Sequence, residues 1–234
     1  MKLEKHIEVE GVITALTGLK IGGTAETVGI GETDNPIIRH PITRAPYIPG
    51  SSLKGKLRSL LEMKYSPRVQ QTGNPCDCSE CSICALFGSG VQRRGRDVEE
   101  KLAQLGPSRL VFRDAMLTDE SAKELDEALP GSFVEVKTEI AMNRNTGSAK
   151  RGALRQQERI PEGMQFDFVL TIRLFEEDMK TGKAKEFLNL VAEGIDILEK
   201  DYLGGCGTRG YGQVEFSTAD EKPLSEYIRS ISVS

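Results

Sequence analysis

Apolar and polar residues alternate along two stretches of the chain, His6–Leu16 and Phe166–Leu174. This period of two predicts a pair of strands, each with one face buried. Apolar runs at Arg109–Leu117 and Ser132–Met142 predict two further strands, and a last strand is expected to end near Phe216. Strands are therefore expected at both ends and in the middle of the chain.

Helical spacing replaces this alternation in two other stretches. Leucines recur three and four residues apart after Pro49, and this stripe predicts a helix that ends near Tyr65. The hydroxyl groups of Ser51 and Ser52 are placed to cap its start. A second apolar stripe predicts a helix over 187–202.

The order of these elements is strand, helix, strand, repeated once. This is the βαββαβ order of ferredoxin-like domains, which RNA-recognition modules share, so we predict an α+β fold with a ferredoxin-like (RRM-like) core. A small acidic helix fits Asp119–Leu129. The segment from Ser66 to about Gly106 is predicted to be an irregular insertion that holds most of the cysteines.

Composition narrows the class of protein. The 234 residues are 38% hydrophobic and 28% charged, which is typical of a globular domain. A net charge of −4 argues against binding nucleic acid with the whole surface, but it leaves room for a local basic groove. Because we find neither a signal peptide nor an apolar run of membrane-spanning length, we expect a cytoplasmic protein with no membrane contact.

Four cysteines lie close together in the segment NPCDCSECSIC. They are Cys76, Cys78, Cys81 and Cys84. In a cytosolic chain such clustering indicates a metal site rather than disulfides, and four thiolates suit tetrahedral Zn²⁺. Because the spacing is cramped, a ligand from elsewhere, such as His40, is an alternative. An iron–sulfur cluster and free thiols are the remaining interpretations.

A glycine-rich run, 204–212, contains a match to G-x-G-x-x-G that begins at Gly205. It follows a predicted helix and precedes a strand, so a dinucleotide-binding fingerprint is rejected. Two interpretations remain: a plain turn, or a loop whose backbone approaches a phosphate closely with Arg209 beside it.

Basic residues gather in two places. From Asn143 to Arg159 the one acid is Glu158, and this reversal of charge fits either a solvated loop or a two-stranded arm along a phosphate backbone. Lys54, Lys56 and Arg58 lie beside the leucine stripe of the first helix. Free N–H groups at a helix start, together with lysines, predict a phosphate site there.

A proline-rich loop precedes this helix, and Asp34 is the one acid of that loop whose setting suggests a catalytic role. A single carboxylate in a loop more commonly has a structural role in a turn. The chain has only two histidines, His6 and His40, and neither belongs to a known catalytic motif. An acid–base mechanism that depends on histidine is therefore not expected.

Eight segments, in order along nearly the whole chain, resemble the backbone-subunit family of type III-A CRISPR–Cas effector complexes, which belongs to the RAMP superfamily. These segments are TGLKIGG (17–23), DNPIIRHPIT (34–43), PGSSLKGKLR (49–58), LFG (86–88), RLVFRDA (109–115), EVKTE (135–139), RQQER (155–159) and DYLGGCGTRGYG (201–212). The resemblance implies a single domain over 1–234, with a ferredoxin-like palm, a cysteine-bearing lid at 66–106 and a thumb hairpin at 141–163.

The resemblance also implies an activity. Several copies would stack along one CRISPR RNA together with other type III-A subunits, and each copy would cleave the complementary target RNA. Asp34 falls at the family's catalytic aspartate, and Mg²⁺ or another divalent cation is implied for cleavage. The resemblance also implies RNA-binding positions. These are Ser51, Ser52, Lys54, Lys56 and Arg58 on the helix, Met142, Arg144 and Arg155 on the thumb, and Gly205, Gly207 and Arg209 in the glycine-rich run.

The chain departs from the family's pattern in two respects. Relatives often have histidine where this chain has Lys20, so no role of that histidine is transferred. Not all relatives carry the four cysteines, so the zinc prediction depends on the cysteines alone. Two alternatives remain: a guide-binding scaffold without cleavage, and a small redox or iron–sulfur protein on a ferredoxin-like fold.

Overall fold

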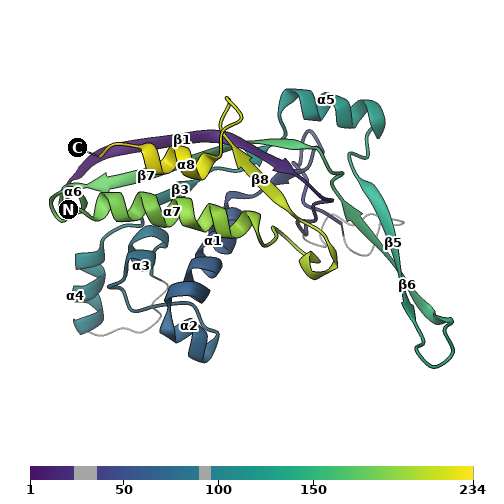
Figure 1. The fold of residues 1–234 in the computed structure, drawn as a ribbon, viewed down its shortest axis with the longest axis horizontal. Coiled ribbons are helices and arrows are strands. Elements are labelled where there is room, and N and C mark those ends of the chain that lie inside the picture. The colour runs from purple at the N-terminus through teal and green to yellow at the C-terminus, as the bar shows by residue number, and fades with distance from the viewer. Residues whose placement is uncertain (24–35, 90–95, 234) are drawn as a thin grey trace.

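The computed structural model describes residues 1–23, 36–89 and 96–233 (Figure 1). Its strands are β1 (Leu3–Ala15), β2 (Tyr47–Ile48), β3 (Leu110–Phe112), β4 (Ala115–Met116), β5 (Glu135–Met142), β6 (Ala149–Arg159), β7 (Gln165–Phe175) and β8 (Val214–Ser217). Its helices are α1 (Gly50–Tyr65), α2 (Pro67–Thr72), α3 (Ser82–Phe87), α4 (Arg96–Leu105), α5 (Asp119–Ala128), α6 (Glu176–Lys180), α7 (Lys183–Glu199), α8 (Leu224–Ser230) and the 3₁₀ turn η2 (Gly207–Arg209). The helices of these described ranges all fall short of the length and apolar character that a membrane span needs.

The main sheet has the strand order β3-β7-β1-β8, with antiparallel neighbours throughout. In chain order its strands are β1, β3, β7 and β8, with α1 after the first and α7 after the third. The strand that comes first in the chain therefore lies between the third and the fourth. This arrangement is ferredoxin-like and confirms the predicted fold class.

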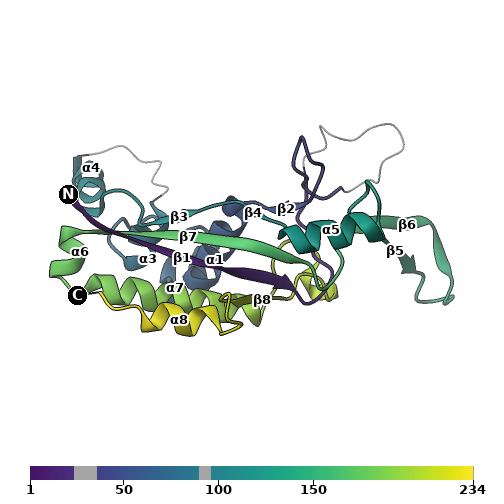
Figure 2. The same cartoon turned by 90° about the horizontal axis from the view of Figure 1, so that it is seen from above.

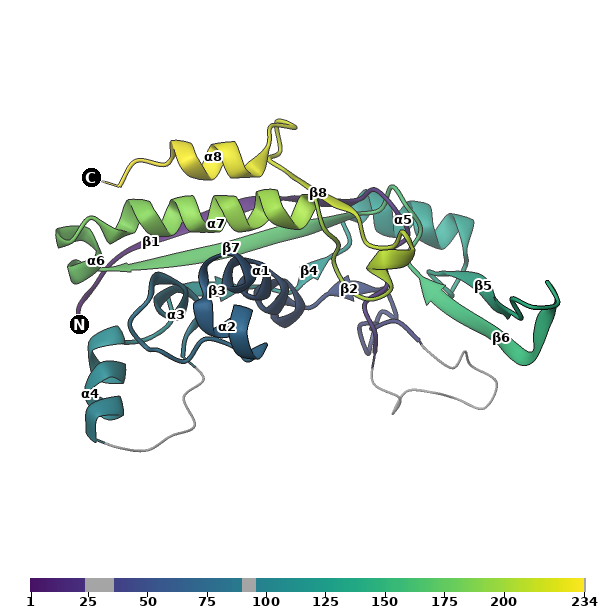
Figure 3. The ribbon, with the colours of Figure 1, turned by 60° about the horizontal axis from the view of Figure 1, so that its bottom comes forward.

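One face of this sheet is buried beneath helices. On β1, Ile7, Val9 and Ile13 are at most 7% exposed, whereas Glu8 and Glu10 on the opposite parity are exposed. The alternation in the sequence thus corresponds to a real inside and outside. Figure 1 shows α7 and α1 below the strands β1 and β7, Figure 3 shows the same helices from another side, and the two helices contact each other.

The insertion after α1 is helical, so the prediction of an irregular segment is wrong. Helices α2, α3 and α4 occupy its described part and lie together at one end of the molecule (Figure 1). Helices of six residues, such as α2 and α3, are too short to show an apolar period in the sequence. The predicted strand at 109–117 is also divided, into β3 and β4, and the two parts pair with different strands, β3 with β7 and β4 with β2.

A hairpin of β5 and β6 projects away from the sheet, opposite the end where the two termini lie (Figures 1 and 2). Its paired residues run from Glu135 opposite Arg159 to Met142 opposite Ala149. The hairpin therefore begins before the boundary expected for the thumb at 141–163. Its function as a thumb stays a prediction.

Candidate nucleic-acid interface and metal centre

The loop 17–23 connects two parts of the chain that are distant from it in sequence. Leu19 exchanges two backbone hydrogen bonds of 2.9 and 2.8 Å with Ile160, at the end of the hairpin. The carbonyl oxygen of Lys20 accepts a bond of 2.8 Å from the N–H of Gly205 in the glycine-rich run. The loop thereby joins the base of the hairpin to the glycine-rich run.

Asp34 lies outside the described residues, but both flanks of its segment are described. The N–H of Gly23 donates to the carbonyl oxygen of Pro36 over 3.0 Å, so the two flanks pair with each other. The N–H of Ile37 donates to Oε2 of Glu158 on β6 over 3.2 Å. The segment that carries Asp34 therefore leaves and re-enters the described structure beside the base of the hairpin.

A cavity of about 550 Å³ lies at this same place. Its lining includes Gly22, Pro36 and Tyr47 together with an ion pair, in which Nη2 of Arg39 lies 3.3 Å from Oε2 of Glu158. Both charged side chains are little exposed. The cavity is a concave space between the flanks of the Asp34 segment and the hairpin.

The start of α1 is capped differently from the prediction. Pro49 occupies the N-cap position, neither serine hydroxyl caps the helix, and the N–H of Gly50 donates to Oδ1 of Asp114 over 2.8 Å. The predicted hydroxyl cap is therefore wrong. Because this carboxylate uses one of the free N–H groups and adds negative charge, the side chains of α1 are better placed than its N-terminus to attract phosphate. The hydroxyls of Ser51 and Ser52 remain candidates for such contacts.

Lys54 and Arg58 lie one turn apart on α1. Burial, followed by the neighbouring charges of Arg58 and Arg173, lowers the pKa of Lys54 below its ordinary value. Because the charged form of Lys54 is disfavoured in this way, a bound anion would stabilise it. Lys54 is therefore the most suitable residue of α1 for a phosphate contact.

Lys56 is engaged within the chain. Its Nζ lies 2.8 Å from Oδ2 of Asp201 and 3.8 Å from the centroid of the Tyr202 ring. A Cβ atom at Gly207 would overlap that same ring. Glycine at this position thus has a packing reason within the protein, besides any approach to RNA.

Three further glycines of the run divide into two kinds. Gly204 and Gly212 have positive φ, and a Cβ atom would overlap the carbonyl oxygens of Lys20 and Leu203, respectively. Gly205 is exposed, and a Cβ atom there would meet only an ordinary contact. Its backbone is therefore accessible to a ligand.

Tyr211 anchors the hairpin to this loop. Its ring is 1% exposed, and its hydroxyl donates to Oε1 of Glu139 on β5 over 2.9 Å, while Arg209 pairs with the other oxygen of that carboxylate. Lys137 and Arg159 lie over the Tyr211 ring, 4.7 and 5.1 Å from its centroid. Burial and the Glu139 carboxylate raise the pKa of Tyr211 to about 12. These contacts set the direction of the hairpin.

The far end of the hairpin is exposed. Met142 is 50% exposed, and Arg144 is also exposed; Arg155, which lies opposite Glu139 nearer the base of the hairpin, is exposed as well. On the strands nearby, Ile140 faces Leu154 across the hairpin, and both are about half exposed. The hairpin therefore presents apolar and basic groups together, a combination suited to bases and phosphates.

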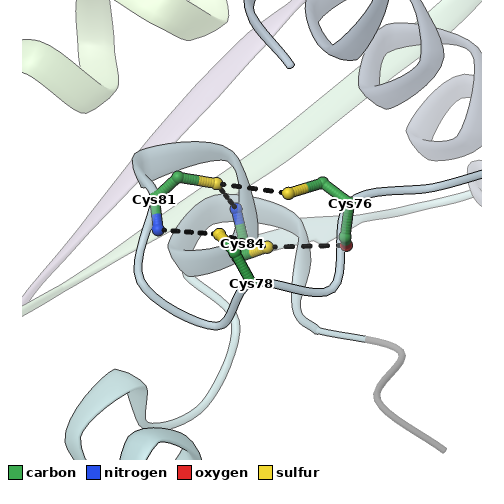
Figure 4. Close-up of side chains that lie close together, drawn as sticks. All are labelled: Cys76, Cys78, Cys81 and Cys84. Carbon is green, nitrogen blue, oxygen red and sulfur yellow. Dashed lines mark hydrogen bonds between the residues drawn. The ribbon is translucent and has the colours of Figure 1, made fainter. Parts of the chain in front are cut away.

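The four clustered cysteines converge, as Figure 4 shows. The sulfur atoms of Cys76, Cys78, Cys81 and Cys84 all lie within 4.8 Å of one another. Two of the pairs, Cys76 with Cys81 and Cys78 with Cys84, are 3.9 Å apart. A tetrahedron with Zn–S bonds of about 2.3 Å has edges of about 3.8 Å, so this donor set fits one tetrahedral ion. His40 instead accepts hydrogen bonds at Nδ1 within its own loop, so an outside ligand is not needed.

Local backbone geometry forms this cluster. Cys81 is the N-cap of α3, and its sulfur accepts from the N–H of Cys84 over 3.4 Å. The sulfur of Cys78 accepts in the same way from the N–H of Cys81. A hydrogen bond from the Cys84 side chain lowers the pKa of Cys81 to about 5. Burial raises the pKa of Cys78, and the hydrogen bond to Cys81 raises the pKa of Cys84. Of these three thiols, Cys81 is therefore the one that favours the thiolate, which is the form that binds metals.

Two side chains of α1 hold the backbone of Cys76. Arg58 donates from Nη2 to the carbonyl oxygen of Cys76 over 2.8 Å, and Oε1 of Glu62 accepts from the N–H of Cys76 over 3.1 Å. Arg58 and Glu62 are themselves paired, with Nε 2.8 Å from Oε1. Glu62 was not among the candidate residues from the sequence. Its spacing of four residues from Arg58 is a recognisable signal for an ion pair on a helix, but not for a contact with the cysteines.

Comparisons with known proteins agree with this geometry. The model of the RAMP superfamily matches residues 12–215. The chain is 42% identical to the CRISPR system Cms endoribonuclease Csm3 of Methanothermobacter thermautotrophicus, over 97% of this chain and 91% of the relative. The protein of the same name from Mycobacterium tuberculosis is 40% identical, over 90% and 86%. The crystal structure of Methanopyrus kandleri Csm3 resembles the fold with a TM-score of 0.55 and 23% identity, over 90% of this chain and 75% of that one.

Proposed function

The chain belongs to the RAMP superfamily, in the family of CRISPR endoribonucleases named Csm3, and we propose that it is the backbone subunit of a type III-A CRISPR effector complex. In this role copies of the chain assemble along a CRISPR RNA with other type III-A subunits and cleave complementary target RNA. The observation that carries the proposal is identity of about 40% to several endoribonucleases of this name over nearly the whole chain.

Guide binding is assigned to α1 and the loops beside it. Lys54 and Arg58 are placed to meet neighbouring phosphates, and the exposed backbone of Gly205 is accessible to another. Sequence specificity comes from base pairing between guide and target, so the protein needs to recognise only backbone and shape. This division agrees with local clusters of basic residues, on α1 and in 143–159, in a chain whose net charge is −4.

Cleavage is assigned to Asp34. The hairpin separates one target nucleotide from the duplex, and the ribose 2′-oxygen then aligns with its own phosphorus. As the 2′-oxygen bonds to phosphorus, the bond from phosphorus to the 5′-oxygen of the next nucleotide breaks, and the leaving 5′-oxygen takes a proton from water, which leaves a 2′,3′-cyclic phosphate and a 5′-hydroxyl. Asp34 accepts the 2′-hydroxyl proton or holds a divalent cation, and such a cation, when bound, stabilises negative charge on the phosphate.

Zinc is the metal proposed for the four cysteines, where it has a structural function. The sulfur spacing fits a single tetrahedral ion, and thiolate ligands suit Zn²⁺. The segment around Cys76–Cys84 has few apolar residues of its own, so a metal would contribute to its folding. A colourless protein that contains zinc would exclude the iron–sulfur alternative.

The function is tested by supplying the purified assembly with its guide and two labelled RNAs. We expect cleavage of a complementary RNA and none of an RNA with unrelated sequence. Purified protein should also carry RNA of discrete length. If the assembly binds complementary RNA but leaves it intact, the chain is a guide-binding scaffold instead.

A further inference from the structure

We propose that Glu62 couples the cysteine metal centre to the guide-binding face of α1, so that metal and RNA bind cooperatively. The inference rests on the function proposed above, because it takes Lys54 and Arg58 as contacts for the guide. It assigns to Glu62 the role of a positioning residue, which acts through Arg58 and Cys76 and touches neither RNA nor metal.

The coupling begins at Cys76, whose sulfur belongs to the metal-binding set. Both polar groups of its backbone are bonded to α1: the N–H to Glu62 over 3.1 Å and the carbonyl oxygen to Arg58 over 2.8 Å. These two bonds fix the position and the orientation of Cys76 relative to the helix. Outer groups that orient a metal ligand in this way raise the metal affinity of a site.

Because the carboxylate of Glu62 is buried, it depends on its hydrogen bonds to Arg58 and Cys76. Glu62 is 3% exposed, and its Oε1 accepts from both Arg58 and Cys76. A buried carboxylate is costly unless it is paired and hydrogen-bonded, so Glu62 depends on both partners being in place. Displacement of Cys76 would leave Glu62 without one of its two donors, and Arg58 without its carbonyl acceptor.

The coupling ends at the basic face of α1. Arg58 uses Nε and Nη2 for Glu62 and Cys76, whereas its Nη1 forms no hydrogen bond with the residues that the structure describes. The charge of Arg58 acts on Lys54, one turn earlier on the same helix. An ordered Cys76 therefore holds Arg58 where Nη1 and Lys54 can act on phosphates together.

Linkage makes the effect reciprocal: if metal strengthens RNA binding by some factor, RNA strengthens metal binding by the same factor. The first experiment measures both affinities in Glu62→Gln, which keeps the size of the side chain and removes its charge. We expect zinc affinity, from competition with a chromogenic chelator, to fall about 10-fold to 100-fold, as for other outer groups. Affinity for a fluorescent single-stranded RNA should fall in the same variant.

The matched control is Glu193→Gln. Glu193 also pairs with side chains of α1, Lys64 and Tyr65, but it forms no hydrogen bond or ion pair with the described residues of the cysteine segment, 76–84. We expect both affinities to stay at the wild-type value in this variant. A loss equal to that of Glu62→Gln would mean that any weakened pair on α1 has this effect, and the inference would be overturned.

A second experiment needs no change at Glu62. RNA affinity is measured with zinc present and after removal of zinc by a chelator, in the wild-type chain and in Arg58→Ala. We expect zinc to strengthen RNA binding in the wild type, and this factor to fall to about one in Arg58→Ala because the connection is absent. The same factor in both proteins, or no effect of zinc in the wild type, would overturn the inference.

Lys54→Ala separates this inference from the function on which it rests. If Lys54→Ala leaves RNA affinity unchanged, the proposed guide-binding face is wrong. If Lys54→Ala weakens RNA binding while zinc does not affect it, the guide-binding face stands and only the coupling fails.

Discussion

Nη2 of Arg58 donates a 2.8 Å hydrogen bond to the carbonyl oxygen of Cys76. A residue assigned to guide binding and a residue assigned to metal binding are therefore in direct contact. Arg58 has two functions as a result, and its replacement disturbs both the basic face of α1 and the cysteine segment. Lys54, which is not bonded to that segment, gives the cleaner test of phosphate binding.

Lys54→Ala is expected to weaken guide binding through the loss of one phosphate contact. Release of counterions makes RNA affinity depend on salt, and each contact to a single strand contributes about 0.7 to the slope of log affinity against log salt. We expect the slope to fall by about that amount. Lys64→Ala is the control, because Lys64 lies on the same helix as Lys54 but pairs with Glu193 of α7. An unchanged slope for Lys54→Ala would contradict the assignment.

The affinity for RNA should also depend on pH through Lys54. Its pKa is lowered in the free protein by burial and by neighbouring positive charges, and a bound phosphate would raise it again. Binding therefore takes up a proton at alkaline pH, and affinity should decline as the pH rises toward the ordinary lysine value of about 10.4. Lys54→Arg keeps its charge and should remove this decline. Titration with 2′-O-methyl RNA avoids hydrolysis of the probe, and equal pH profiles for both proteins would exclude Lys54.

Loss of the metal should loosen the cysteine segment and leave the palm folded. Replacement of Cys78 and Cys81 by serine is expected to remove about one zinc per chain, measured by mass spectrometry of the metal. Limited proteolysis should then cut first between α1 and β3. Cys206→Ser is the control and should retain the zinc, because Cys206 lies outside the cluster. A carefully reduced wild-type protein without zinc would contradict the site.

Tyr211→Phe should weaken the attachment of the hairpin. The substitution removes the hydrogen bond from the hydroxyl to Glu139, and a bond to a charged group contributes about 1.5–3 kcal/mol. We expect a loss of that size in the free energy of unfolding and faster amide exchange in β5. The exposed residue Tyr227, changed to phenylalanine, serves as the control. Unchanged exchange in β5 would mean that other contacts hold the hairpin.

Elements whose pattern of apolar residues is regular over many positions could be predicted from the sequence. Alternation located β1 and β7. The leucine stripe located α1, which ends near the expected residue, Tyr65, and Leu53 and Leu61 of the stripe are fully buried. The clustered thiols were also sufficient to predict a metal site, and the structure removes the need for His40. In these cases the signal lies within a short segment, so no knowledge of the fold was required.

What could not be predicted depends on residues distant in sequence. Asp114, which caps α1, is 64 positions from Gly50. Glycine is required at 207 because a Cβ atom there would overlap the ring of Tyr202, which also contacts Lys56. Nothing in the glycine-rich run itself reveals that reason. Glu62 was missed because a buried acid on the polar side of an apolar stripe looks like an ordinary surface residue.

Asp34 carries the central claim that this chain cuts RNA. A general base contributes about 10²–10⁴-fold to a rate, or roughly 3–5 kcal/mol of barrier. Binding, in contrast, is spread over many phosphate contacts and should survive the loss of one acid. Asn at this position keeps the turn-forming side chain without its charge, so it separates chemistry from shape.

The decisive measurement is the rate of target cleavage by assembled complexes that contain Asp34→Ala or Asp34→Asn, with guide and target binding measured on the same preparations. We expect both variants to bind guide and target as the wild type does, and both to lose cleavage. Wild-type cleavage by Asp34→Asn, with an inactive Asp34→Ala, would reduce Asp34 to a residue that shapes its loop. Cleavage by both variants would contradict the assignment of the catalytic residue.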